Sequence, residues 1–208
     1  MENNNQIDGN VIHATEQNKE VKDIDVFYEL LRRLDITRRA RIKASTRLRE
    51  KHEFYEKTSY FYSIVILVLS IWFIDSSGDI TKVLLIASLS LTFYTMFLGI
   101  KNYKERASNF ENNYQQLNEL LNKMQRLEAD KHKITQNVLK ELHREYEKLI
   151  IDKENHLPID FMMCNSENET RFKNEIKRYK RIDTAKKESI LIFPFILLAI
   201  FLFTEYLN

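Results

Sequence analysis

Two long apolar blocks joined by a short polar turn constrain the fold of this chain more than any other feature. The first is YFYSIVILVLSIWFI over residues 60–74, and the second is VLLIASLSLTFYTMFLGI over residues 83–100; neither contains a charged side chain. At a rise of about 1.5 Å per residue, the second block is roughly 27 Å long, close to the hydrocarbon thickness of a bilayer. A buried hairpin of a soluble protein would need a polar face on each helix, and neither block has one. The sequence therefore predicts a transmembrane hairpin over residues 60–100, with spans at about 60–74 and 82–100.

A third apolar block, ILIFPFILLAIFLFTEY, follows at residues 190–206. It predicts a third transmembrane helix over residues 189–207, with Pro194 in its first turns, where a missing backbone amide costs least. The chain has only three Gly and two Pro, so few turns are expected. We therefore predict an all-α membrane protein: a transmembrane helical hairpin extended into cytoplasmic coiled-coil-like helices, plus a C-terminal transmembrane helix.

Basic residues flank the apolar blocks and are absent from the turn between the first two. Residues 32–57 carry ten Lys or Arg against four acids, and residues 171–187 carry eight against two. The turn at 75–79 has two Asp and no base. Because cytoplasmic flanks carry the excess of Lys and Arg, the N-terminus is predicted to be cytoplasmic, with the turn and the C-terminus outside. The basic residues are also expected to contact the headgroups of the lipid bilayer. No nucleic-acid-binding module is recognisable, so direct nucleic-acid binding is not expected.

The polar parts of the chain divide into three segments. Residues 1–21 are rich in Asn, Gln and Glu and are expected to be a disordered tail; residues 22–59 predict a basic cytoplasmic helix, and residues 101–188 a cytoplasmic helical region. In the last segment, apolar residues follow the spacing of a coiled coil at Tyr103, Ala107, Phe110, Tyr114, Leu117, Leu121 and Met124. This spacing fits either a homo-oligomeric seam or packing against the 25–58 helix of the same chain.

The turn around Pro158 gathers the side chains that invite a chemical interpretation: Glu154, Asn155, His156, Asp160 and Cys164. A Cys–His pair could serve nucleophilic catalysis, and His with carboxylates could bind zinc. Against both, the turn has one His and one Cys, and the chain has no HExxH, GxSxG or phosphate-binding glycine loop. We therefore expect a capping and docking turn between helices, with no enzyme activity, cofactor or metal.

Small and hydroxyl residues form one face of the second predicted span. Ser88, Thr92, Thr95 and Gly99 are spaced four, three and four residues apart. Such residues let helices approach closely, so this face is predicted to be an intramembrane packing seam, or to line a pore once several copies assemble. No ionisable residue lies near the middle of a span, which argues against a proton-coupled transporter.

The segment RRARIKASTRLREKHEFYEKTSYFYSIVILVLSIW, followed after the turn by NYKERASNFENNYQQLNEL, resembles the SLATT family of bacterial two-transmembrane effectors associated with SMODS and SLOG genes. The resemblance covers roughly residues 25–207 and rests on the basic run before the first span and on the helix start Tyr103–Lys104–Glu105–Arg106–Ala107. Glu154–Asn155–His156 with Asp160, and the third span, are similar to the branch with an added C-terminal transmembrane helix.

The resemblance implies an effector of an anti-phage defence system in the bacterial inner membrane. Such an effector would oligomerise and then permeabilise or depolarise the membrane, by forming a pore for example, when a sensing partner activates it. The implied partner is a nucleotide-signalling enzyme or a reverse transcriptase. The alternative is a membrane-anchored helical scaffold or adaptor that recruits a partner and leaves the membrane intact.

Overall fold

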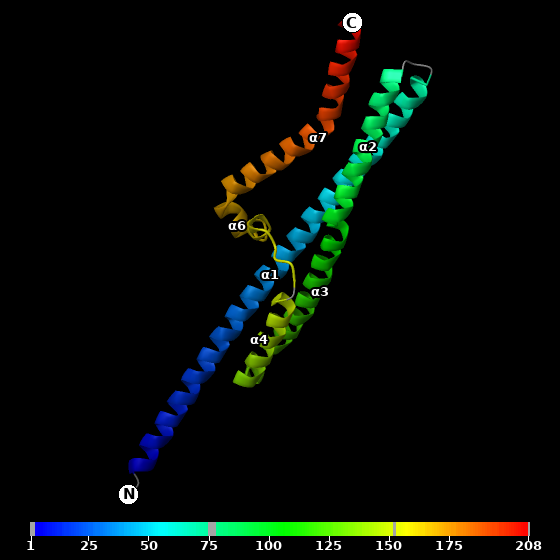
Figure 1. The fold of residues 1–208 in the computed structure, drawn as a ribbon. Helices are drawn as coiled ribbons and strands as arrows, with labels where there is room; N and C mark the ends of the chain where they lie inside the picture. The colour runs from blue at the N-terminus through cyan, green and yellow to red at the C-terminus, as the bar shows by residue number, and fades with distance from the viewer. Residues whose placement is uncertain (1–2, 75–77, 152, 208) are drawn as a thin grey trace. The chain divides into compact units, whose positions relative to one another are not determined.

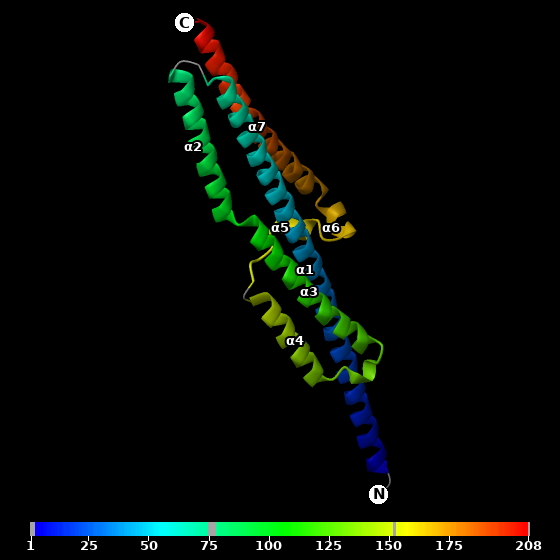
Figure 2. The same ribbon diagram turned by 90° about the vertical axis from the view of Figure 1, so that its right-hand side faces the viewer.

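The computed structural model describes residues 3–74, 78–151 and 153–207, and no strand occurs within those ranges. Its helices in chain order are α1 (Asn3–Trp72), α2 (Gly78–Lys101), α3 (Tyr103–Glu128), a 3₁₀ turn (Lys131–Lys133), α4 (Gln136–Ile151), α5 (Pro158–Met162), α6 (Ser166–Arg171) and α7 (Lys173–Leu207) (Figures 1 and 2). The predicted all-α class is confirmed for these residues.

Helix α1 extends through most of residues 1–21, which the sequence predicted to be a disordered tail. The side chains of residues 1–20 lie outside the described residues. From residue 10 to the end of the helix there is no Gly or Pro, so nothing in the sequence breaks the backbone hydrogen-bond ladder.

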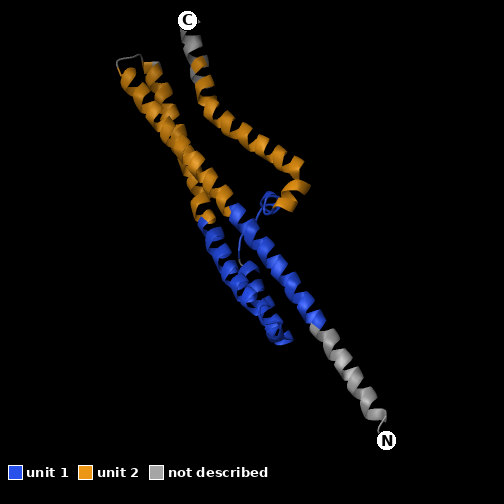
Figure 3. Cartoon of the chain, turned by 180° about the vertical axis from the view of Figure 1, so that it is seen from behind, with its two compact units in different colours: residues 1–44, 108–165 blue, residues 45–107, 166–208 orange. Residues whose placement is uncertain are grey.

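The chain forms two compact units, shown in Figure 3. Unit 1 comprises residues 1–44 and 108–165, and unit 2 comprises residues 45–107 and 166–208. The core of unit 1 is a three-helix cluster of α1, α3 and α4. Its buried members are Phe27, Leu30, Leu34, Leu117, Leu120, Leu121, Met124, Ile134, Leu139, Leu142 and Tyr146. The regularly spaced residues of α3 therefore pack within their own chain. This agrees with the sequence interpretation in which they pack against the 25–58 helix.

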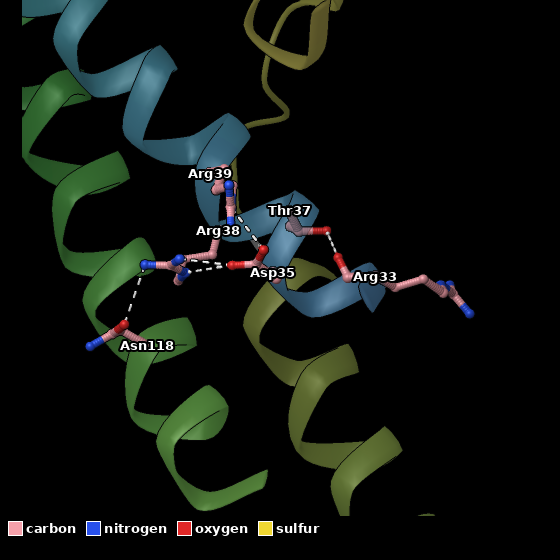
Figure 4. Close-up of polar contacts among 6 residues, drawn as sticks. All are labelled: Arg33, Asp35, Thr37, Arg38, Arg39 and Asn118. Carbon is pink, nitrogen blue, oxygen red and sulfur yellow. Dashed lines mark hydrogen bonds and ion pairs between the residues drawn. The ribbon is translucent and has the colours of Figure 1, made fainter. Parts of the chain in front are cut away.

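Polar contacts at the edge of this core tie α1 to its neighbours (Figure 4). Asp35 accepts hydrogen bonds from Arg38 and Arg39, each at 2.7 Å, and Arg38 also reaches the side-chain oxygen of Asn118 on α3. Thr37 donates to the carbonyl of Arg33 at 2.9 Å. Its single proton is thereby used, so the Tyr146 hydroxyl of α4 donates to Thr37 across 2.9 Å.

Unit 2 contains the apolar part of α1, all of α2 and the whole of α7. Where α1 and α3 approach each other in this unit, Ser45 is buried and donates to the carbonyl of Ala107 at 3.0 Å. The rings of Tyr55 and Tyr103 stack with centroids 5.7 Å apart. Small residues at this point bring the two backbones close before the apolar blocks begin.

Judged by length and composition, one helical stretch of the described residues could cross a membrane. It is Ile80–Glu128, and its most apolar window has a mean hydropathy of 2.0 with none of the window buried. The second predicted span lies in this stretch. Helix α1 ends at Trp72, before the end of the first block at residue 74. In the third block the side chains of residues 197, 198 and 200–207 lie outside the described residues. The three-span arrangement therefore stays a prediction.

A break at Asn102 separates α2 from α3. Asn102 has φ 47°, in the left-handed region that Asn tolerates better than most residues. Its N–H donates to the carbonyls of Leu98 and Gly99, both at 3.2 Å, which ends α2 as a left-handed cap. Helix α3 starts at the next residue, so the chain changes direction here over one position.

Pro194 is in the interior of α7, not in the first turns of a helix that starts near residue 189. The expectation was wrong because the basic segment before the apolar block is itself helical, and α7 runs unbroken from Lys173 into the block. Figure 1 shows α7 bent along its length, as expected of a helix with an internal Pro.

Candidate functional site

The predicted seam on α2 is an open surface of unit 2. Ser88, Thr92, Thr95 and Gly99 are all exposed. The three hydroxyls donate to carbonyls of their own helix: Ser88 to Leu85 at 2.8 Å, Thr92 to Ser88 at 3.0 Å and Thr95 to Thr92 at 2.9 Å. Among the described residues, and apart from the nearby backbone of α2, a Cβ added at Gly99 would meet no atom within 4 Å. The structure thus leaves these small residues on the surface with their polar atoms satisfied.

A different side of α2 packs within the unit. Most of the half-buried residues described in this helix recur at three- and four-residue steps, at Ile80, Leu84, Ala87, Leu91, Tyr94 and Leu98, and Val83 lies beside them. Residue 87 and residue 88 are adjacent, so the seam lies about a quarter of the way round the helix from this packed side. At the end of the helix nearest Gly78, Ser88 also lines a groove of about 390 Å³ with Ser70 of α1 and Thr81 and Leu85 of α2.

The turn before α5 is organised by Pro158 and Asp160. Leu157 has φ −75° and ψ 156°, the extended geometry expected before Pro, and Pro158 then takes the first position of α5. Asp160 is fully buried, and its Oδ2 accepts a hydrogen bond from the Leu157 N–H at 2.9 Å. A carboxylate at this position stabilises a helix start. Asp160 therefore acts here as a capping residue.

Arg41 fastens the preceding loop to α1. Its side chain is only 3% exposed, its Nη1 donates to the backbone carbonyl of Glu154, and its guanidinium carbon lies 5.2 Å from the ring centre of Phe110. Burial lowers the pKa of Arg41, and Glu154 is among the groups that oppose the shift. The sequence assigned this Arg, with its neighbours, to lipid headgroups; in the structure Arg41 is a core contact of unit 1.

His156 completes this cluster. The residue is half-buried, and its Nδ1 has no hydrogen-bond partner among the described residues. Burial first, and then the charge of Arg41, lowers the pKa of His156, while Asp160 opposes the shift. Cys164 is buried nearby in sequence, and within the described residues no three His, Cys, Asp or Glu side chains come together as a metal site. Glu154 and Asn155 are exposed at the surface of the turn.

Comparison with models of protein families shows which family the chain belongs to. The model of the SMODS and SLOG-associating 2TM effector domain family 5 matches residues 24–206, which is nearly the whole chain. The chain belongs to the SLATT family. Comparison with curated proteins and with solved structures finds no match.

SLATT proteins are two-transmembrane effectors associated with defence systems, and the family is not one of known enzymes. Membership associates this chain with a membrane and with partner proteins of SMODS and SLOG systems. The matched region extends through both units, and it includes α7 together with the hairpin.

Two residues of this SLATT chain make contacts between helices or loops that the sequence did not predict. Arg41 lies one heptad after Leu34 and one before Leu48, both buried, so its position on the apolar stripe could have marked it as a core residue. Tyr62 lies in the first apolar block, and its hydroxyl makes two hydrogen bonds to α7, described below. No local pattern marks that contact.

The environment of His156 predicts a pH dependence for the SLATT fold. Because the folded-state pKa lies below the ordinary value, the unfolded chain binds the proton more tightly; stability is full above about pH 6.5 and falls as the pH drops below it. We expect the midpoint of thermal unfolding to fall between about pH 7.5 and about pH 5.5, and to fall less in His156→Gln, which cannot be protonated. Equal pH profiles for the two proteins would contradict this role.

Proposed function

We propose that this SLATT protein is an anti-phage effector of the bacterial inner membrane that oligomerises and permeabilises or depolarises the membrane when a partner activates it. The observation that carries the proposal is the exposed face of Ser88, Thr92, Thr95 and Gly99 on the most apolar helix. Its hydroxyls donate to their own helix, and all four residues are exposed, so among the described residues most of this face is left uncovered. Surfaces of this kind let transmembrane helices approach closely.

The proposed topology has three spans, a cytoplasmic N-terminus and an external C-terminus. The basic flanks at residues 32–57 and 171–187 support this orientation by the excess of Lys and Arg on the cytoplasmic side. Unit 1, which contains α3 and α4, is then cytoplasmic and available to a partner. We propose a nucleotide-signalling enzyme or a reverse transcriptase as that partner, in keeping with the association of the family with SMODS and SLOG systems.

Assembly through the seam would act as a switch between two states. In the resting state the seam faces lipid, and in the assembled state it faces the same helix of another copy. A change of about 5.5 kcal/mol in relative stability moves such an equilibrium from 1:99 to 99:1. Close packing repeated over several copies can supply a difference of that size, and a pore could then be lined by the hydroxyl residues.

The test uses two exposed serines of α2 that lie on different sides of the helix. Ser88 is on the seam, and Ser90 is about 200° away around the helix. Both are exposed, and each donates at 2.8 Å to a carbonyl of its own helix, Ser88 to Leu85 and Ser90 to Ile86. Ser88→Leu should block close approach of copies, and a loss of about 1.4 kcal/mol per contact lowers association about tenfold. Ser90→Leu makes the same change and should have no such effect.

Both variants are expressed at matched levels, with membrane potential followed by dye and oligomers by crosslinking. Gly99→Leu serves as a second seam variant, because a Cβ added at Gly99 meets no described atom within 4 Å beyond its own turn of helix. We expect Ser88→Leu and Gly99→Leu to lose both signals and Ser90→Leu to keep both. If all variants depolarise cells equally, the seam is not the damaging surface. If the parent leaves the potential unchanged even during infection, the scaffold function replaces this proposal.

A further inference from the structure

The interior Pro of α7 leaves a backbone carbonyl without its helical hydrogen bond inside an apolar segment. Pro194 has no backbone N–H, so the carbonyl of Ile190, four residues earlier, loses its helical donor. The ring of Pro194 also crowds that turn of the helix. In water the carbonyl could bind solvent, but in hydrocarbon an unsatisfied backbone carbonyl costs several kcal/mol and needs a protein donor. The residues around Pro194 are apolar, IFPFI, and offer none.

The donor comes from a different helix, α1. The hydroxyl of Tyr62, on α1, lies 2.7 Å from the carbonyl oxygen of Ile190 and 2.8 Å from that of Leu191. Its single proton is shared between the two acceptors. Beside this contact the rings of Phe61 and Phe195 lie with centroids 6.1 Å apart, so the polar contact is flanked by an aromatic one.

We propose that Tyr62 and Pro194 form a polar latch: the phenol takes the place of the missing amide and holds α7, bent at Pro194, against α1. The donor belongs to α1, so α7 cannot leave α1 without exposing the carbonyl that Pro194 has orphaned. The turn of α7 just before Pro194 is thus held by a contact that can open without unwinding the helix. The latch lies wholly within unit 2 and does not depend on the seam of α2.

A double-mutant cycle on the full chain in mild detergent tests the latch. Tyr62→Phe removes only the hydroxyl, and the orphaned carbonyl should lower the midpoint of thermal unfolding by about 2–4 °C. Pro194→Ala restores an amide that can donate to Ile190, so the hydroxyl becomes redundant. In that background we expect Tyr62→Phe to change the midpoint by less than about 1 °C. The control is Tyr60→Phe, two residues away on α1. Tyr60 is exposed, and its hydroxyl donates to the Glu56 carboxylate at 3.4 Å.

The second measurement is crosslinking between α1 and α7. A short bismaleimide joins Cys residues introduced at 61 and 195 in a Cys164→Ser background, and Tyr62→Phe should slow this reaction about threefold to tenfold. In the Pro194→Ala background the rate should already be slow, because the restored amide satisfies Ile190 without joining α7 to α1, and Tyr62→Phe should slow it no further. Equal effects of Tyr62→Phe and Tyr60→Phe, or equal effects of Tyr62→Phe with Pro or Ala at 194, would overturn the latch. The much smaller effect of Tyr62→Phe on the unfolding midpoint in the Pro194→Ala background also separates loss of the latch from general misfolding.

Discussion

Replacing Leu117 by Ala should lower the free energy of unfolding of the unit 1 core by about 3 kcal/mol. Leu117 is fully buried on α3 and belongs to the cluster formed with α1 and α4. The truncation removes apolar contacts and leaves a cavity that three helices cannot all close around. Hydrogen exchange of amides in α3 and α4, measured on the full chain in detergent, should report the loss as opening at roughly a hundredfold higher rate.

The matched control is Leu157→Ala, which makes the same chemical change on a side chain that is 47% exposed. It should alter exchange in α3 and α4 by less than about twofold, because surface substitutions stay within about 0.5 kcal/mol. Similar effects at the two positions would mean that α3 is not packed as the structure shows, and that its apolar stripe faces another copy.

Replacing Arg41 by Ala should lower the free energy of unfolding by about 2–3 kcal/mol. The change deletes a hydrogen bond from a charged donor to the Glu154 carbonyl and removes the side chain that covers the ring of Phe110. Arg39→Ala is the control on the same helix: Arg39 is paired with Asp35 at 2.7 Å, but its side chain is 48% exposed, and such pairs contribute little. The midpoint of denaturant unfolding of the purified chain should fall in the first variant and stay within error in the second.

The variant Arg41→Met separates the contribution of the hydrogen bond to Glu154 from that of the packing against Phe110. Met keeps an unbranched side chain against Phe110 and removes a buried charge whose Nε has no hydrogen-bond partner among the described residues. Global stability should then recover toward that of the parent, since apolar residues often replace buried charges at little cost. The loop at residues 153–157 should remain loosened, seen as faster tryptic cleavage after Lys153 than in the parent. Slow cleavage in Arg41→Met would show that the Glu154 contact does not hold the loop.

Periodicity in the sequence predicted which side of α3 is buried, but not how wide that side is. Ala107, Phe110, Leu117, Leu121 and Met124 were placed on the stripe and are buried. Leu120 was left off it and is equally buried, because α4 packs beside α1 and widens the contact surface of α3. A two-helix spacing rule cannot anticipate a third helix that arrives from later in the chain.

The polar contacts could not be predicted for a related reason. Arg41 and Glu154 are 113 residues apart, and Tyr62 and Ile190 are 128 apart. Hydropathy and helical spacing describe one element at a time and say nothing about which elements meet. The Asp160 cap was within reach of the sequence, because it joins residues three apart and depends on local turn chemistry around Pro158.

The break at Asn102 gives the two arms of the hairpin different mechanical properties. The outgoing arm is part of α1, a helix with no interruption up to Trp72, and a helix of that kind resists twisting along its whole length. The returning arm changes from α2 to α3 through one residue with φ 47°, which can absorb rotation at a single pair of backbone dihedrals. A torque applied to the chain would therefore be carried by α1 and relieved at Asn102. The hairpin would respond to it by turning one helix against the other rather than by moving as a rigid pair.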